Sequence, residues 1–156
     1  MRRNTLGILC LSAAIAACAG GRSNIVGPEL FAYTASSEVT STNPMQFRTS
    51  ITVTNPTSDN IAIVGQPCNT PRVLVYATAA RTGTPLWDSN NRTSVCTLPG
   101  ASITLAAGKS VTYIANVTGA EVLGASGSAG TYYITDQVSL SGVVSQATAG
   151  QVNLTR

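Results

Sequence analysis

The side chains of this sequence that could do acid–base chemistry are few and scattered. The chain has no histidine, which excludes histidine-based triads, imidazole general bases and histidine metal sites. A pair of carboxylates can hydrolyse a glycosidic bond, but most of the acidic residues here stand beside turn residues, where a carboxylate bonds to nearby backbone. We therefore expect a protein that is not an enzyme. The six acidic residues are Glu29, Glu38, Asp59, Asp88, Glu121 and Asp136.

Two other polar groups lack the partners that a reactive site requires. Asp88-Ser89-Asn90 begins like a calcium-binding loop, but the glycine and the glutamate of such a loop do not follow. Lys109 comes directly after a hairpin glycine, a position typical of a solvated turn. No glycine-rich segment stands between a strand and a helix to hold a phosphate. We expect no cofactor and no bound metal.

The first seventeen residues have the order of an export signal. Arg2 and Arg3 give a positive start, and the apolar run from Leu6 to Ile15 is too short to span a membrane. Small residues then lead to a cysteine. Ile15-Ala16-Ala17-Cys18 resembles the lipobox of bacterial lipoproteins, in which the chain is cut before the cysteine and the cysteine is acylated.

The lipobox resemblance implies a membrane anchor. Cys18 would carry fatty-acid chains such as palmitate and become the first residue of the mature protein, and two or more chains hold a protein stably on a bilayer. Ala19 stands where an aspartate would retain a lipoprotein at the inner membrane. The resemblance therefore implies the outer membrane or periplasm in a two-membraned host. The alternative is an ordinary signal peptide cut near Ala17 or Ala19.

Two cysteines remain beyond the export segment, which contains Cys10, and the proposed anchor. In an oxidising compartment Cys68 and Cys96 are expected to form a disulfide, since they are an even pair. Such a loop closure stabilises a fold by roughly 3 kcal/mol in the chain-entropy model. The alternatives are two free thiols or a metal site, and the latter lacks the further ligands for tetrahedral coordination.

Composition divides the chain into three parts and predicts an all-β fold. After the signal 1–17, a Gly-, Ala- and Ser-rich tether 18–29 precedes one domain, 30–156. Without Arg2 and Arg3, seven basic residues face six acidic ones, so nucleic acid is not an expected partner. Only 10% of the residues are charged, and Thr, Ser, Val, Ala and Gly dominate. This composition favours strands over helices.

Hydrophobic alternation places the strands. In 46–55, Phe47, Ile51 and Val53 alternate with polar residues, which is typical of a strand with one buried face. Similar runs separated by turn residues continue to 143–154. We expect 103–105 and 110–117 to be adjacent strands and 121–130 to be a loop. Seven to nine short strands predict an immunoglobulin-like antiparallel β-sandwich.

Several fragments of this pattern together form a known family pattern. They are Ile51–Ile63, Cys68 with Val73–Tyr76, Gly83–Trp87, Ile103–Tyr113 and Gly130–Ile134. These fragments resemble the BsuPI-type intracellular proteinase inhibitor family, whose members are small immunoglobulin-like sandwiches. The resemblance covers about Phe47 to Leu140 and implies the fold and, by the family's name, protease inhibition. The chain departs from the family in its export signal and cysteine pair.

Two aromatic residues are predicted core anchors. Trp87, the only tryptophan, follows a glycine-containing turn and should pack against one sheet. Gly130-Thr131-Tyr132 resembles the corner of a sandwich at which a tyrosine bonds back to nearby backbone. Both positions are structural, so neither identifies an activity.

We expect a non-enzymatic, membrane-tethered module that binds another protein, with protease inhibition as the activity that the resemblance suggests. The alternative is an accessory domain of the cell envelope that binds an assembly partner through an exposed sheet edge. The candidate binding loops are Arg81, Thr82, Gly83, Thr84 and Pro85, and Asp88, Ser89, Asn90 and Asn91.

Overall fold

The computed structural model of the chain describes residues 30–92, 98–124 and 127–155. These residues form nine strands, two 3-10 turns and one short helix, which confirms the predicted all-β fold. The strands are β1 (Ala32–Thr42), β2 (Met45–Thr54), β3 (Ile61–Val64), β4 (Arg72–Tyr76), β5 (Trp87–Asp88), β6 (Ser102–Leu105), β7 (Ser110–Thr118), β8 (Gly130–Leu140) and β9 (Val143–Leu154). The 3-10 turns are η2 (Pro67–Asn69) and η3 (Ser89–Asn91), and the helix is α1 (Gly119–Leu123).

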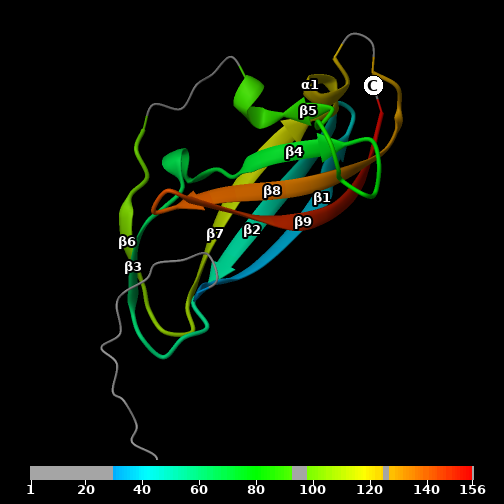
Figure 1. Ribbon diagram of the computed structural model, residues 1–156. Helices are drawn as coiled ribbons and strands as arrows, with labels where there is room; N and C mark the ends of the chain where they lie inside the picture. The colour runs from blue at the N-terminus through cyan, green and yellow to red at the C-terminus, as the bar shows by residue number, and fades with distance from the viewer. Residues whose placement is uncertain (1–29, 93–97, 125–126, 156) are drawn as a thin grey trace, which may run out of the picture.

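Two antiparallel sheets pack face to face as a sandwich (Figure 1). One has the order β1-β2-β7 and the other the order β5-β4-β8-β9. Read as A-B-E and C′-C-F-G, these orders are those of an immunoglobulin sandwich. A separate two-stranded sheet, β3-β6, extends from one end. The predicted antiparallel sandwich is therefore present.

The core follows the two-residue period of the strands. Along β2 the side chains of Phe47, Ile51 and Val53 are fully buried, as the alternation predicts. The buried residues form two hydrophobic clusters, one toward each end of the sandwich. The first includes Phe47 and Ile134, and the second includes Ile51 and Tyr113.

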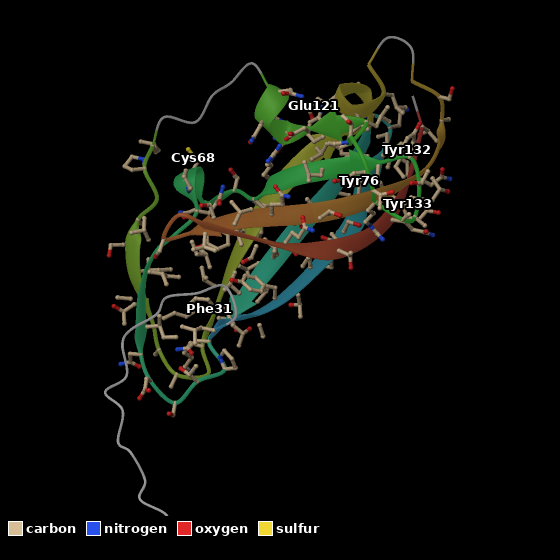
Figure 2. The ribbon with its side chains drawn as sticks, in the orientation of Figure 1. Phe31, Cys68, Tyr76, Glu121, Tyr132 and Tyr133 are labelled. Carbon is tan, nitrogen blue, oxygen red and sulfur yellow. The ribbon has the colours of Figure 1, made fainter. Side chains whose placement is uncertain are left out.

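The two ends of the sandwich differ in what they carry. The described chain enters β1 at the end where Ala32 pairs with Thr54 and where β3 and β6 lie. We call this the tether end. At the opposite, distal end lie α1, the start of β8 and the loop 77–86 that follows β4, since Tyr76 pairs with Tyr133 there. Figure 2 shows Phe31 at the tether end, well away from these two tyrosines.

The outer face of the β1-β2-β7 sheet is covered by hydroxyl groups that bond to one another. Thr52 and Thr112 have their hydroxyl oxygens 2.8 Å apart, and Thr54 and Ser110 make an equivalent contact of 2.8 Å. Both are cross-strand pairs of the kind that stabilises sheets. The hydroxyl-rich face therefore satisfies much of its hydrogen bonding internally.

One expected loop begins with a helix. The segment 121–130 was expected to be a loop, but α1 includes its first residues. The hydroxyl of Thr118 accepts a bond from the backbone N–H of Glu121 (3.2 Å), and the Glu121 carboxylate accepts one from the Thr118 N–H (2.8 Å). This is a capping box, and its Thr-x-x-Glu signature is visible in the sequence. The prediction of a loop is wrong at its first residues because the capping box starts a helix despite the small residues that follow.

The strands β6 and β7 also differ from expectation, because they are not hydrogen-bonded neighbours. β6 pairs with β3, whereas β7 pairs with β2. The fully buried Asn55 directs the chain between the two sheets. Its backbone N–H donates to the Lys109 carbonyl at 2.9 Å, and its side-chain amide donates to the Leu105 carbonyl at 2.9 Å. The turn therefore crosses from one sheet to another.

Tyr132 occupies the predicted corner. Its ring is buried, with 8% of the residue exposed, and its hydroxyl donates to the Ser128 carbonyl at 2.6 Å. The bond returns to backbone four residues upstream, as in the tyrosine corner of immunoglobulin sandwiches. The predicted role of Tyr132 as a core anchor agrees with this position.

We predict that Tyr132→Phe lowers the free energy of unfolding by about 1 kcal/mol, because the Ser128 carbonyl loses its donor. Urea denaturation monitored by tryptophan fluorescence would measure the change. Tyr33→Phe is the control, since the Tyr33 ring packs edge-on against Phe31 and its hydroxyl makes no hydrogen bond within the described part of the chain. Equal effects of the two variants would contradict the assignment of the corner.

Candidate functional site

The loop between β4 and β5 carries the first set of candidate binding residues. Thr82, Gly83 and Thr84 form its exposed tip, while Arg81 and Pro85 on either side are half-buried. Gly83 has a φ of 77°, a left-handed conformation that glycine adopts without strain. The tip therefore projects into solvent at the distal end of the sandwich.

Arg81 fastens the base of this loop to the sheet. Its Nη2 donates to the Gly150 carbonyl at 2.9 Å, and its Nη1 donates to the Ala79 carbonyl at 3.1 Å. The guanidinium lies over the ring of Tyr133, with its central carbon 5.4 Å from the ring centroid. A register shift between β8 and β9 and a φ of 90° at Gly150 mark the point of attachment. The loop is therefore held at its base and free at its tip.

A cavity of about 280 Å³ opens beside Arg81 on the outer face of the β5-β4-β8-β9 sheet. The pairing of Tyr76 with Tyr133 and of Thr135 with Thr148 brings strands β4, β8 and β9 together at its floor. Figure 2 shows Tyr76 and Tyr133 close together at this end. The lining residues are Tyr76, Ala80, Arg81, Thr135, Gln146, Ala147 and Thr148.

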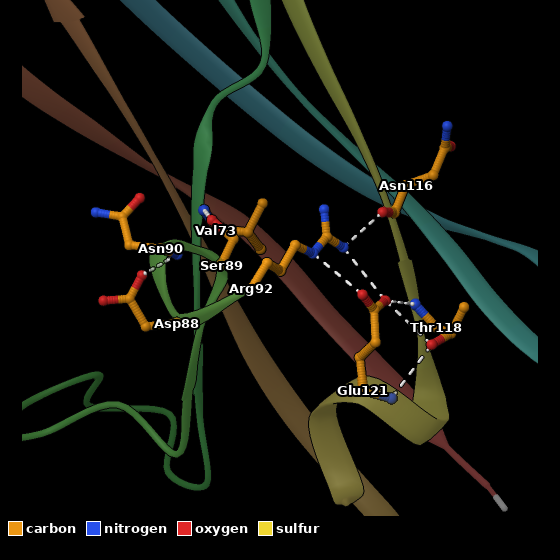
Figure 3. A network of polar contacts seen from close by, with 8 residues as sticks. All are labelled: Val73, Asp88, Ser89, Asn90, Arg92, Asn116, Thr118 and Glu121. Atoms are coloured by element: carbon orange, nitrogen blue, oxygen red, sulfur yellow. Dashed lines mark hydrogen bonds and ion pairs between the residues drawn. The ribbon is translucent and has the colours of Figure 1, made fainter. Parts of the chain in front are cut away.

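The second set of candidate residues is mostly engaged in structural contacts. Asp88 forms an ion pair with Arg72, and this hydrogen-bonded guanidinium holds the pKa of the Asp88 carboxyl below its usual range. Asp88 also accepts a bond from the Asn90 backbone N–H at 2.9 Å, and the Ser89 hydroxyl accepts one from the Val73 N–H at 2.9 Å (Figure 3). Of this set only Asn90 and Asn91 are exposed, so they alone can meet a partner freely.

Arg92 ties this second loop to the opposite sheet. Its Nε lies 3.1 Å from a Glu121 carboxylate oxygen, and its Nη2 donates to the Asn116 carbonyl at 2.8 Å (Figure 3). Its guanidinium also lies over the Trp87 ring, 5.2 Å from the centroid. Trp87 is half-buried and packs against the first cluster from its edge, rather than within it. Trp87, which was predicted to be a core anchor, therefore contacts the core but remains partly exposed.

The two loops do not form one surface. Asp88 pairs with Leu74, and Ser89 bonds to Val73, so the second loop lies beside the start of β4. The loop that contains Arg81 follows the other end of the same strand. The structure therefore favours the first loop and its cavity as the candidate site.

Asp136 is a buried carboxylate that the sequence reasoning did not separate from the carboxylates near turns. It lies within β8 and is fully buried, and one of its oxygens accepts a 2.6 Å hydrogen bond from the Thr49 hydroxyl. Its other oxygen has no hydrogen-bond partner among the residues that the structure describes. Burial raises the pKa of Asp136 to about 6, and the bond from Thr49 opposes this shift. The alternation along β8 was the signal that could have identified it.

The described residues next to Asp136 are mostly apolar. Its neighbours across the sheet are Val73 on β4 and Ala147 on β9, and Thr49 faces it from β2. Within residues 30–92, 98–124 and 127–155, no three His, Cys, Asp or Glu side chains gather to hold a metal. Asp136 and Thr49 form a buried polar pair between the two hydrophobic clusters.

We predict that protonation of Asp136 stabilises the fold at acidic pH. The folded-state pKa of about 6 lies above the ordinary value of 3.8, so the folded protein binds this proton more tightly than the unfolded chain. The stabilisation is fully present below about pH 4 and is lost as the pH rises through about 6, for a total of about 3 kcal/mol.

Urea denaturation of the wild type and of Asp136→Asn, at a series of pH values from about 4 to about 7, tests this. The difference in unfolding free energy between the two proteins should change across this interval in favour of the wild type at low pH. A difference that stays constant with pH would contradict the assignment.

The cysteines fall partly outside the described residues. Cys68 lies in η2 at a φ of 56°. Cys96, its predicted partner, and Cys18, the predicted lipid site, both lie outside the described ranges, so the pairing and the acylation stay predictions. The described helix is too short to cross a bilayer.

Comparisons with known proteins do not identify a family. No protein-family model matches the chain, and no curated protein sequence does. Among solved structures, a Bordetella pertussis protein assigned as ApaA is 14% identical, with a TM-score of 0.36 over 80% of this chain and 93% of that one. β-Glucosidase 3B from Thermotoga neapolitana is 12% identical, with a TM-score of 0.35 over 81% of this chain and 17% of that one. Similarities this low carry no argument about function.

Proposed function

We propose that this protein is a membrane-anchored, non-enzymatic module that binds another protein through the loop containing Arg81–Pro85. The observation that carries the proposal is the position of this loop at the distal end, opposite the end at which β1 begins. A lipid on Cys18 would hold the tether end toward the membrane. The exposed tip, Thr82–Thr84, would then face away from it.

The construction of the loop supports a binding role. A loop whose base is already held loses less conformational freedom when a partner binds, so more of the contact energy appears as affinity. Arg81 provides that restraint through Gly150 and Tyr133, while the tip stays exposed. The tip carries no charge of its own, so shape and hydrogen bonding would determine recognition.

The alternative, binding through a sheet edge, has less support. Two of the edge strands, β1 and β9, lie against each other, and the Ser37 hydroxyl donates to the Ala149 carbonyl at 2.6 Å. The strands β3, β5, β6 and β7 are the other sheet edges. Both β1 and β9 also have a register shift, at Val39/Ser41 in β1 and opposite Ile134/Thr135 in β9. Bulges and covered edges are the features by which sheets avoid pairing with other chains. We therefore favour the loop over the edge.

Protease inhibition is the specific activity that the resemblance to the BsuPI-type family suggests. Arg81 itself would not enter a protease pocket in this arrangement, because its side chain is bonded to Gly150 and stacked on Tyr133. The residues presented to a protease would be Thr82, Gly83 and Thr84. Cys68 paired with Cys96 would stabilise the domain in the oxidising compartment where such a partner is met.

We predict that Thr84→Glu weakens binding to the partner by at least about tenfold, because it places a charge and a larger side chain on the presented tip. Inhibition would be measured by mixing the protein in excess with proteases of several classes, and binding by capture from membrane extracts. Thr34→Glu is the control, since Thr34 is exposed on the outer face of the other sheet. If no protease is inhibited, the proposal of protease inhibition is refuted. If both variants capture the partner equally, the proposal that the loop binds it is refuted.

We predict that radiolabelled palmitate enters the wild type but not Cys18→Ala, because acylation at Cys18 requires its thiol. Cys10→Ala is the matched control, since Cys10 lies in the segment expected to be removed. Immunoprecipitation followed by autoradiography would measure the label. Equal labelling of Cys18→Ala and the wild type would refute the anchor.

A further inference from the structure

We infer that the cavity beside Arg81 binds a carboxylate group of the protein partner. This inference rests on the proposed function, because it specifies what the partner presents next to the loop. The ligand would be an acidic side chain or a chain terminus, seated on the outer face of β4, β8 and β9.

Arg81 differs from the other described arginines because no described carboxylate pairs with its charge. Arg48 pairs with Glu38 at 3.4 Å, Arg92 pairs with Glu121 at 3.1 Å, and Arg72 pairs with Asp88. Arg81 contacts only backbone carbonyls and the Tyr133 ring, and no carboxylate among the described residues neutralises it. A half-buried guanidinium without a counter-charge favours the binding of an anion.

One donor of Arg81 also lacks an acceptor. Its Nε is buried from solvent and makes no hydrogen bond to any described residue, although both terminal nitrogens are bonded to carbonyls. Because this N–H is closed to solvent, an anion in the cavity would act on it through its charge rather than through a direct hydrogen bond. Arg81 is one of the lining residues, so a ligand in the cavity lies near its positive charge.

The rest of the lining supplies neutral donors and no acid. Thr135, Thr148 and Tyr76 contribute hydroxyl groups to the lining. Gln146 contributes an amide whose oxygen already accepts a bond from the Gln137 amide nitrogen at 3.0 Å, which leaves the Gln146 nitrogen as a donor. Donors that surround one cation are complementary to an oxygen anion.

The charge and the size of the cavity favour a carboxylate over a phosphate. The lining holds one cation, Arg81, which matches the single charge of a carboxylate, whereas sites for a phosphate usually combine several cationic or backbone donors. A volume of about 280 Å³ is sufficient for an acidic side chain. The adjacent exposed tip 82–84 would contact the residues around that group.

The test is a titration followed by NMR of the full chain in detergent micelles, with propionate as the probe. Propionate should give saturable shifts of the Arg81 Nε–H signal and of the backbone amides 146–148. Propionamide has the same shape without the charge, and it should bind at least about tenfold more weakly. Equal binding of the two probes, or no saturation by propionate, would overturn the inference. Tighter binding of inorganic phosphate to the same signals would also overturn it.

Two variants connect the binding to the cavity. Arg81→Gln should abolish the propionate shifts, but it also removes the bonds that hold the loop. Gln146→Glu keeps those bonds and places a carboxylate within the lining, so it should neutralise Arg81 and lower propionate affinity at least about tenfold. Gln46→Glu adds the same charge on β2 in the other sheet and should have no effect. Unchanged binding by Gln146→Glu would overturn the inference.

The propionate titration needs no partner protein. Failure of the carboxylate site can therefore be distinguished from failure of the proposed function. Propionate binding without any captured partner would refute the proposed function and leave the carboxylate site standing. A partner lost in Thr84→Glu but unaffected by Gln146→Glu, with no propionate binding, would leave the loop standing and refute the carboxylate site.

Discussion

The hydrogen bond between Thr49 and Asp136 joins the two sheets through the middle of the core, and the register of the sandwich depends on it. Both residues are fully buried, and each lies between residues of the two hydrophobic clusters along its strand. A slip of one residue in β2 or β8 would turn the polar group outward and bring its neighbours inward. A slip of two residues would place a carboxylate within a hydrophobic cluster, where it would have no donor.

The position of the candidate loop follows from that register. With β8 held by Asp136, the register shift next to Ile134 brings the Gly150 carbonyl of β9 to the edge of the distal end. Arg81 reaches this carbonyl and stacks on Tyr133, so the loop is attached to the same strands that carry the core. The packing of the core therefore determines where the candidate loop lies. The geometry of the loop depends on β8 and β9 more than on its own sequence.

Periodicity predicted the strands well because each strand buries one face. Phe47, Ile51 and Val53 were correctly identified as interior residues from their spacing alone. Tyr132 was found from the local glycine and tyrosine pattern, which carries its own geometry. Asp136 was missed because a charged residue at an inward position was read by its chemical type rather than by its place in the alternation.

What the sequence could not predict depends on contacts between distant segments. The capture of Arg81 by Gly150 joins residues 69 positions apart, and the crossing at Asn55 depends on carbonyls far along the chain. The same reason explains why Trp87 lies at the margin of the core, since Arg92 covers its ring from outside. Spacing within a segment predicts which face is buried, but it does not predict which remote group closes a site.

Under the proposed membrane anchoring, the hydroxyl-rich face of the β1-β2-β7 sheet has a consequence for how neighbouring molecules meet. Thr52 with Thr112 and Thr54 with Ser110 already satisfy one another, so a neighbouring molecule gains little by displacing them. This outer face presents neither a cluster of like charges nor a continuous hydrophobic patch to adjacent macromolecules. Association between neighbouring copies through this face would be weak, so molecules at high density on a bilayer would stay monomeric and free to diffuse.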